Sequence, residues 1–246
     1  MKLTNEVYLV GGGDNGFNIS NRFDCNVFVI RGHKESVLVD VGFDGPDEIL
    51  RNIEEDGLDP AEITRIFVTH YHADHTGALA YLKRKLGASV IAGVEAAPAI
   101  RNGDADEIGL TWATSIGYYP PDFRWEACEV ETEMGDGDQF QVGGLEVTSI
   151  ATPGHCKGHY SFLLKGPDRT YLFSADQVFW GGAILLQNVP DANIQDCAAS
   201  MAKLLTYEFD ALIPSHLNFS LEHGRRHVEA ASRAFEQTGL PRNLFS

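Results

Sequence analysis

One short stretch concentrates side chains that bind metal ions. Residues 69–77 have the sequence THYHADHTG and follow the end of an apolar run, where a strand turns into a helix. Its imidazoles and carboxylate cannot all be buried without a cation, because each unpaired polar group costs roughly 1 to 3 kcal/mol. In an extended chain the side chains of His70 and His72 point to the same side, because they are two residues apart. The chain then turns, so Asp74 and His75 can point in another direction. Since imidazole and carboxylate are good zinc ligands, the stretch predicts two adjacent metals.

Four further stretches carry chemistry-bearing residues at strand ends. They are VLVD ending at Asp40, TPGH ending at His155, SAD ending at Asp176 and IPSH ending at His216. Taken alone, Asp40, Asp176 or His216 would each be interpreted as a solvated residue at the end of a strand. Their order and context, together with the His-x-His-x-Asp-His string, resemble the signature of the metallo-β-lactamase superfamily over nearly the full length.

This resemblance implies an α/β fold, specifically an αββα four-layer sandwich. Two mixed β-sheets would lie face to face with helices outside, and the ligands would gather on loops at one edge. We expect a single domain over residues 1–246.

The resemblance also implies how the ligands are divided. Seven residues would hold two divalent metal ions: His70, His72 and His155 the first ion, Asp74, His75 and His216 the second, and Asp176 both. Zinc is the expected metal, with iron or manganese left open.

Two residues are expected behind the ligands. Asp40 would accept a hydrogen bond from a ligand imidazole and so fix its tautomer and ring orientation. The resemblance gives His159 a similar supporting role, and a partly exposed strand residue is the alternative. For His33, His223 and His227, in a turn and a polar helix, we expect solvated side chains.

The chemistry that this ligand set implies is hydrolysis. Two divalent cations sharing a bridging water lower its pKa toward about 7, which gives a hydroxide nucleophile at neutral pH. Asp74 would orient this nucleophile, and a cation would stabilise the developing oxyanion. Carboxylic esters, thioesters and lactones suit the chemistry because their leaving groups need only modest acid assistance.

The resemblance narrows the range of expected substrates but does not identify a single substrate. Asp176 with a final histidine resembles hydroxyacylglutathione hydrolases and acyl-homoserine lactonases more than true β-lactamases. The resemblance disfavours glutathione thioesters, since hydroxyacylglutathione hydrolases bind glutathione with a helical C-terminal domain. Residues 217–246, which follow His216, are too few for such a domain. A mononuclear iron persulfide dioxygenase and a β-lactamase remain as alternative functions.

Two aromatic segments are candidates for substrate contact. Residues 104–124 lack a sustained period and contain Trp112, Tyr118 and Tyr119, so they form either a lid or substrate wall or an ordinary surface excursion. Phe179 and Trp180 lie just past Asp176 and would line the pocket from the opposite side, unless they form a tight glycine turn.

The elements that must position these residues alternate along the chain. We expect helices at 46–55, 77–86, 193–206 and 223–237 from apolar periodicity. Short β-branched and aromatic runs predict strands at about 6–10, 26–31, 36–41, 64–69, 88–92, 138–142, 145–150, 160–165, 170–174 and 209–213. The opening strands form hairpins, and 64–69, 77–86 and 88–92 form a βαβ unit.

Charge and composition limit the partners. The formal net charge of −16 disfavours nucleic acid and anionic membranes. No apolar run approaches the length of a membrane helix and the first ten residues lack a signal-peptide pattern, so we expect a cytoplasmic protein. Four isolated cysteines predict reduced thiols, with Cys156 as a minor candidate nucleophile. A small-molecule substrate is expected, and a homo-oligomer is left open.

Overall fold

The chain divides into two compact units, each built on one sheet. The computed structural model describes residues 1–189, 191–237 and 239–244. The first unit comprises residues 1–134 and 142–144, and the second comprises residues 135–141 and 145–246. The expectation of a single domain over 1–246 stays a prediction.

The first unit contains a mixed six-stranded sheet in the order β1-β2-β3-β4-β5-β6. Its strands are β1 (Val7–Gly11), β2 (Val27–Arg31), β3 (Ser36–Val39), β4 (Ile63–Phe67), β5 (Ser89–Gly93) and β6 (Thr132–Met134). The first three strands pair antiparallel, and β3 to β6 pair parallel. The expected hairpins and the βαβ unit are therefore confirmed.

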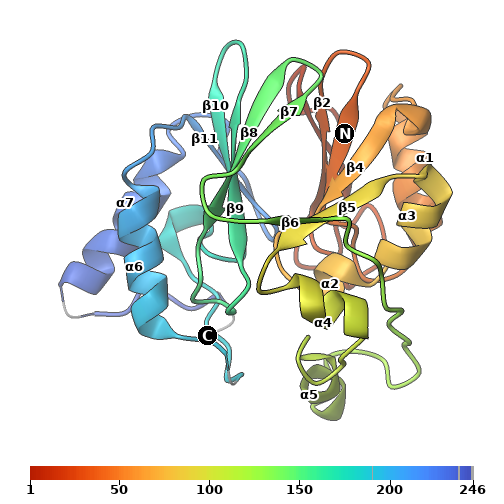
Figure 1. The fold of residues 1–246 in the computed structure, drawn as a ribbon. Coiled ribbons are helices and arrows are strands. Elements are labelled where there is room, and N and C mark those ends of the chain that lie inside the picture. Colours follow the sequence, from red (N-terminus) through yellow and green to blue (C-terminus); the bar gives the residue numbers. More distant parts are fainter. Residues whose placement is uncertain (190, 238, 245–246) are drawn as a thin grey trace. The chain divides into compact units, whose positions relative to one another are not determined.

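Helices in the first unit make the parallel crossovers. They are α1 (Pro46–Glu55), the 3-10 turn η1 (Pro60–Glu62), α2 (Ala73–Thr76), α3 (Leu79–Leu86), α4 (Ala97–Asn102) and α5 (Leu110–Ser115). Helices α1 and α3 lie against one face of the sheet (Figure 1). Each buries an apolar stripe at helical spacing, Ile49 with Ile53 and Leu79 with Leu82, as amphipathic helices on a sheet do.

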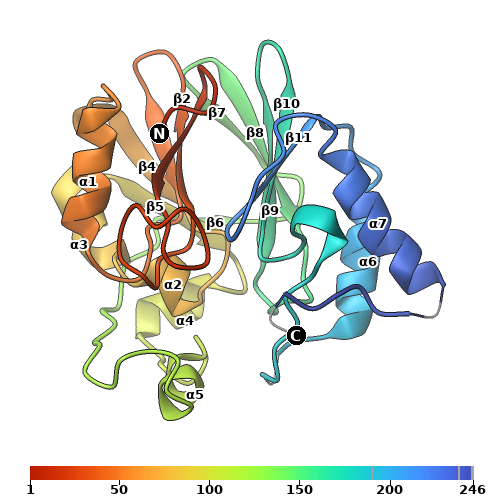
Figure 2. The ribbon, with the colours of Figure 1, turned by 180° about the vertical axis from the view of Figure 1, so that it is seen from behind.

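The second unit contains a mixed five-stranded sheet in the order β11-β10-β9-β8-β7. Its strands are β7 (Gln139–Val142), β8 (Leu145–Ala151), β9 (Tyr160–Lys165), β10 (Thr170–Ala175) and β11 (Ala211–Pro214). Strands β8, β9 and β10 pair antiparallel, and β11 joins β10 in parallel. The 3-10 turn η2 (Trp180–Gly182) follows β10, and α6 (Ile194–Leu204) and α7 (Arg225–Glu236) cover one face of this sheet (Figure 2).

The core of the second unit lies between this sheet and its helices. Met201 and Leu204 from α6 and Val228 from α7 are buried against Leu172 and Leu212 of the sheet. At roughly 1.5 to 3 kcal/mol for each fully buried large apolar side chain, this contact is a main source of the unit's stability.

The elements expected from periodicity are present, and several short ones were missed. All ten expected strands and four expected helices occur within a few residues of their expected bounds. The short elements β6, α2, α4 and α5 were not predicted, because three to six residues are too few to show a period. Helix α5 lies inside 104–124, so that segment is not entirely irregular.

None of the helices formed by the described residues is long and apolar enough to cross a bilayer.

Candidate metal centre

The first ligand cluster forms where β4 turns into α2. His70 and His72 lie in the connecting turn, and Asp74 and His75 lie in the single helical turn of α2. Thr76 closes this turn, because its hydroxyl donates to the carbonyl of His72 at 3.0 Å. All four candidate ligands are buried, with exposed fractions of 9% or less. Buried imidazoles and a carboxylate at this density match a cation site better than an apolar core.

Distances within this cluster fit shared coordination. His70 Nε2 lies 3.1 Å from His72 Nδ1, and Asp74 Oδ2 lies 3.6 Å from His75 Nε2. Two ligand atoms on a tetrahedral zinc ion, each at 2.0 to 2.1 Å, are about 3.4 Å apart. The donor atoms present therefore fit divalent cations.

Asp40 and Thr69 fix the imidazoles of this cluster. The Asp40 carboxylate accepts hydrogen bonds from the Thr69 backbone N–H, the Thr69 hydroxyl and His75 Nδ1, each at 2.8 Å. Because the Thr69 hydroxyl proton points to Asp40, its oxygen accepts from His70 Nδ1 at 3.0 Å. Both histidines then carry the ring proton on Nδ1 and present the Nε2 lone pair, the form that binds metal.

Cys25 completes this environment as a neutral thiol. Its Sγ lies within 4.8 Å of ligand atoms of Asp40 and His75. Burial raises the pKa of the Cys25 thiol to about 12. All four cysteines are free and buried, which includes the minor candidate Cys156.

The second ligand cluster forms at one edge of the second sheet. His155 follows β8, Asp176 follows β10 and His216 follows β11. The strand directions bring the ends of β8, β10 and β11 to the same edge. Asp176 Oδ2 lies 3.6 Å from His155 Nε2 and 3.5 Å from His216 Nε2. These separations are long for hydrogen bonds and suit ligands that share a cation.

Neighbouring groups orient this second cluster. His155 Nδ1 donates to the carbonyl of Leu185 at 2.8 Å, which leaves Nε2 as the metal-binding atom. His159 is fully buried, so the alternative of a partly exposed residue is wrong. Its Nε2 accepts from the Asp176 backbone N–H at 3.1 Å, and its Nδ1 donates to the Thr152 hydroxyl at 3.0 Å. Nε2 thus holds the Asp176 backbone, while the bond between Nδ1 and Thr152 fixes the orientation of the ring.

Strained backbone marks both clusters. Asp40, Ala175 and Leu217 have φ values of 59°, 45° and 55°, in the left-handed region that non-glycine residues rarely adopt. Each lies at or next to a residue of the clusters. Strain of this kind costs of order 1 to 3 kcal/mol per residue and is concentrated at functional sites.

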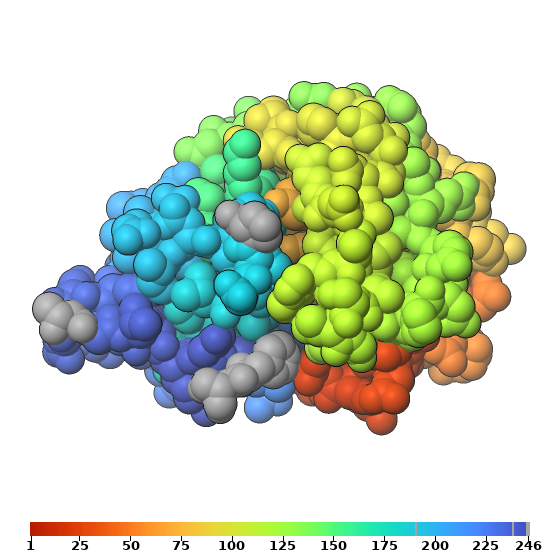
Figure 3. Space-filling view, turned by 90° about the horizontal axis from the view of Figure 1, so that it is seen from below, coloured from red at the N-terminus to blue at the C-terminus, as the bar shows by residue number. Residues whose placement is uncertain are grey.

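The segment 104–124 contacts the first cluster. Tyr119 is buried and its hydroxyl donates to Asp74 Oδ1 at 2.9 Å. A Cβ added at Gly109 would lie 3.7 Å from the His72 ring. Just beyond the segment, Trp125 Nε1 donates to the Thr76 hydroxyl at 3.0 Å. Trp112 and Tyr118 remain exposed at 37% and 42%, on a segment that forms part of the surface in Figure 3.

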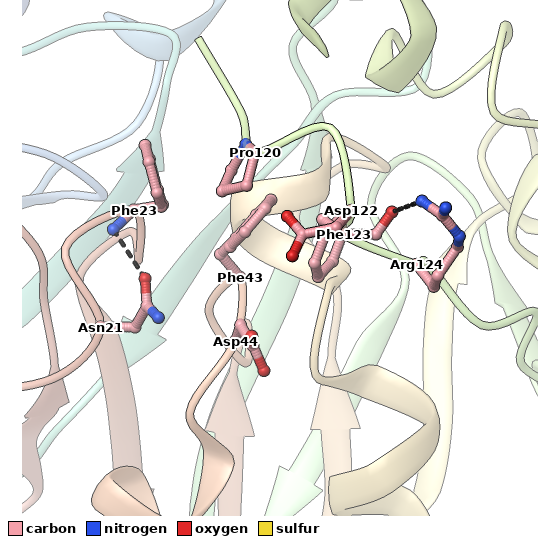
Figure 4. Close-up of a pocket in the computed structure, with 8 residues that line it drawn as sticks. All are labelled: Asn21, Phe23, Phe43, Asp44, Pro120, Asp122, Phe123 and Arg124. Carbon is pink, nitrogen blue, oxygen red and sulfur yellow. Dashed lines mark hydrogen bonds between the residues drawn. The ribbon is translucent and has the colours of Figure 1, made fainter. Parts of the chain in front are cut away.

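Two pockets flank the end of this segment. One, of about 360 Å³, is lined by Asn21, Phe23, Phe43, Asp44, Pro120, Asp122, Phe123 and Arg124. Figure 4 shows Asn21 and Phe23 at one end of it and Arg124 at the other, with Phe43 between them. The other, of about 460 Å³, adjoins α5 and shares Phe123 and Arg124 as lining residues. The wall of a substrate pocket remains a prediction for this segment.

Phe179 and Trp180 have packing contacts in the second unit. Phe179 is fully buried, with its ring centroid 6.3 Å from that of His216. Trp180 packs on His227 at 4.6 Å, with the Arg226 guanidinium 5.2 Å from its ring. His227 is buried and bonded to Ser220 and the Gly181 N–H, so the expectation of a solvated histidine was wrong there.

Sequence reasoning missed two residues that act on the first cluster. Thr69 lies in the motif without a predicted role, although a hydroxyl next to a ligand histidine is a signal for an orienting hydrogen bond. Tyr119 was expected as a substrate contact, and no pattern in the sequence indicates its bond to Asp74, 45 residues away. Each unit thus gathers its own share of the seven expected ligands.

Comparison with known proteins is consistent with these two clusters. The family model described as the metallo-beta-lactamase superfamily matches residues 20–216. Acyl-coenzyme A thioesterase MBLAC2 from Bos taurus is 28% identical over 232 residues, covering 84% of this chain and 79% of the relative. A hydroxyacylglutathione hydrolase from Rhizobium johnstonii is 31% identical over 192 residues, covering 74% and 62%.

Solved structures share the fold. A metallo-beta-lactamase with a HARLDQ motif from Cronobacter sakazakii aligns with a TM-score of 0.73 at 23% identity, covering 97% of this chain and 96% of its own. A metallo-beta-lactamase family protein from Thermus thermophilus aligns with a TM-score of 0.73 at 20% identity, covering 96% and 81%. The expected fold class, with two mixed sheets and flanking helices, is confirmed.

Proposed function

Because the chain belongs to the metallo-β-lactamase superfamily, we propose that it is a dinuclear metal-dependent hydrolase of thioesters, with carboxylic esters and lactones as related substrates. The relatives reported above are named as hydrolases. Both names also describe thioester substrates, an acyl-coenzyme A and an acylglutathione. Thioesters therefore take precedence over the other two bond types.

The observation that carries the proposal is the ligand geometry around Asp176 Oδ2. Two imidazole nitrogens, from His155 and His216, lie 3.5 to 3.6 Å from this one oxygen. That arrangement suits a carboxylate that would contribute to the binding of two metal ions. We propose that His70 and His72 join His155 on the first metal, and that the remaining ligands, Asp74, His75 and His216, hold the second.

The chain's own residues have defined tasks in this proposal. Bound divalent ions would supply Lewis-acid polarisation of the substrate carbonyl and would lower the pKa of a water molecule toward neutrality. Asp74 would accept a hydrogen bond from that water and orient it toward the carbonyl carbon. Asp40 and Thr69 would keep the Nε2 atoms of His75 and His70 deprotonated for coordination. Zinc is the proposed metal on the basis of the nitrogen-rich donor set.

The test uses purified, metal-quantified protein and matched substrates. We expect about two metal ions per chain. An acyl thioester should be hydrolysed faster than the oxygen ester and the lactone of the same acyl group, and a chromogenic β-lactam should be turned over slowest. Chelation should abolish all of these activities. Fastest turnover of the β-lactam would refute the assignment of thioesters.

Ligand variants separate the dinuclear hydrolase from the mononuclear iron dioxygenase. His216→Ala and His75→Ala should each lose roughly one metal per chain and most thioesterase activity, because each removes a ligand of the second ion. His33→Ala is the control, since His33 is an exposed residue in the turn between β2 and β3, at the opposite end of β3 from Asp40. Wild-type metal content in both ligand variants, together with iron-dependent oxygen consumption on a persulfide, would overturn the proposal.

A further inference from the structure

Tyr119 is held in a rigid aromatic cluster. Its ring stacks on Phe43 with centroids 4.6 Å apart and planes 19° apart, and meets Phe23 edge-on at 5.8 Å. On its other side Phe43 stacks on Phe123 at 3.8 Å. The Phe43 backbone is itself fixed, because its N–H donates to the buried Asp24 carboxyl at 2.6 Å. The phenol therefore has little freedom to swing away from the position it occupies.

This cluster delivers the Tyr119 hydroxyl to one oxygen of Asp74. The hydroxyl donates to Oδ1 at 2.9 Å, and the other oxygen, Oδ2, lies 3.6 Å from His75 Nε2. A carboxylate rotates readily about its terminal bond unless a partner holds one oxygen. With Oδ1 occupied by the phenol, Oδ2 is the oxygen presented beside the coordinating nitrogen of His75.

We propose that Tyr119 is a positioning residue for Asp74, which fixes the carboxylate rotamer that the second metal and the nucleophilic water require. The inference rests on the proposed function for the role of Asp74. It reassigns Tyr119 from a substrate contact to a group that acts through Asp74. The physical basis is pre-organisation, because hydrogen-bond partners of ligating carboxylates typically contribute 10- to 100-fold to metal affinity or activity.

Tyr119→Phe removes only the hydroxyl and keeps the ring stacking. The matched control is Tyr81→Phe, since the Tyr81 hydroxyl also donates to an aspartate, Asp47, at 2.8 Å on the exposed face of α3. For Tyr119→Phe we expect the affinity for the second zinc ion, measured by chelator competition, to fall about 10- to 100-fold. We expect kcat for the thioester to fall by a similar factor with KM within about twofold. Tyr81→Phe should match the wild type in every measurement.

A double-mutant cycle shows whether Tyr119 acts through Asp74. If it does, adding Tyr119→Phe to Asp74→Asn should produce little further loss of zinc affinity, because the oriented carboxylate is already absent. Additive losses, or wild-type zinc affinity in Tyr119→Phe, would overturn the proposal. Melting of the metal-free variants checks the fold. A thioester-inactive but metal-binding wild type would refute the proposed function while the zinc-affinity arm still decides the role of Tyr119.

Discussion

The Asp40→Asn substitution changes one oxygen of a fully buried carboxylate into an amide NH₂. In the structure Oδ1 accepts from the Thr69 backbone, and Oδ2 accepts from the Thr69 hydroxyl and from His75 Nδ1. Asparagine tolerates a φ of 59° as well as aspartate does, so the backbone conformation is not the reason for any effect. The perturbation is therefore confined to the hydrogen-bond network.

Neither orientation of the new amide satisfies this network. With its NH₂ at the Oδ2 position, the amide faces the His75 Nδ1 proton, so His75 must move that proton to Nε2 and lose its coordinating lone pair. With the amide flipped, its NH₂ faces the Thr69 backbone N–H. A buried donor without an acceptor costs roughly 1 to 3 kcal/mol, which is the loss of unfolding free energy that we expect for the metal-free protein.

The affinity for the second metal should fall together with this stability. Loss of a partner that orients a ligand histidine typically costs 10- to 100-fold, which is roughly 1.4 to 2.7 kcal/mol of binding free energy. Chelator competition measures the affinity, and denaturant unfolding of stripped protein measures the stability. Asp44→Asn is the control, since Asp44 is exposed on the same loop. Wild-type zinc affinity in Asp40→Asn would refute the reasoning.

Two further substitutions test the supporting structure. Burial raises the pKa of Asp24 from 3.8 to about 7, so its contribution to folding stability is present below pH 3.8 and is lost as the pH rises through 7. Asp24→Asn should therefore gain up to roughly 4 kcal/mol over the wild type between pH 4 and pH 8 in denaturant unfolding, and parallel pH curves would contradict this. Gly154 has a φ of 138°, and an added Cβ would lie 2.5 Å from the Cys197 backbone nitrogen. Gly154→Ala should lower stability by roughly 3 kcal/mol or more, whereas Gly57→Ala, with positive φ but open space, should lose about 1 kcal/mol; equal melting of the two variants would refute the steric argument.

The ligands and the sheets could be predicted because their signals are local. His70 to His75 lie within six residues, and the strands carry runs of β-branched and aromatic residues such as VFVI in β2. Helices α1 and α7 show their apolar stripes over ten or more residues. Short elements such as α2 and α5 could not be found this way, because one or two helical turns contain too few positions to establish a period.

The supporting contacts could not be predicted because they join residues far apart in the sequence. Asp40 reaches His75 across 35 residues, and Tyr119 reaches Asp74 across 45. His227 was misjudged for a related reason. Its helix has a polar composition, but contacts with η2 and Ser220 bury His227. The burial of one polar residue by a distant segment does not change the apolar periodicity of the helix, so the sequence pattern does not indicate it.

The hydrogen bonds around the first cluster form a chain rather than independent pairs. Because the Thr69 hydroxyl gives its one proton to Asp40, it is the acceptor in its bond with His70, and the same Asp40 oxygen accepts from His75. The protonation states of two candidate ligands are therefore set together by one carboxylate. Such coupled networks lose more than the sum of their pairs when one member is removed. It follows that Asp40, which binds no metal itself in this proposal, should be as sensitive to substitution as the histidines it orients.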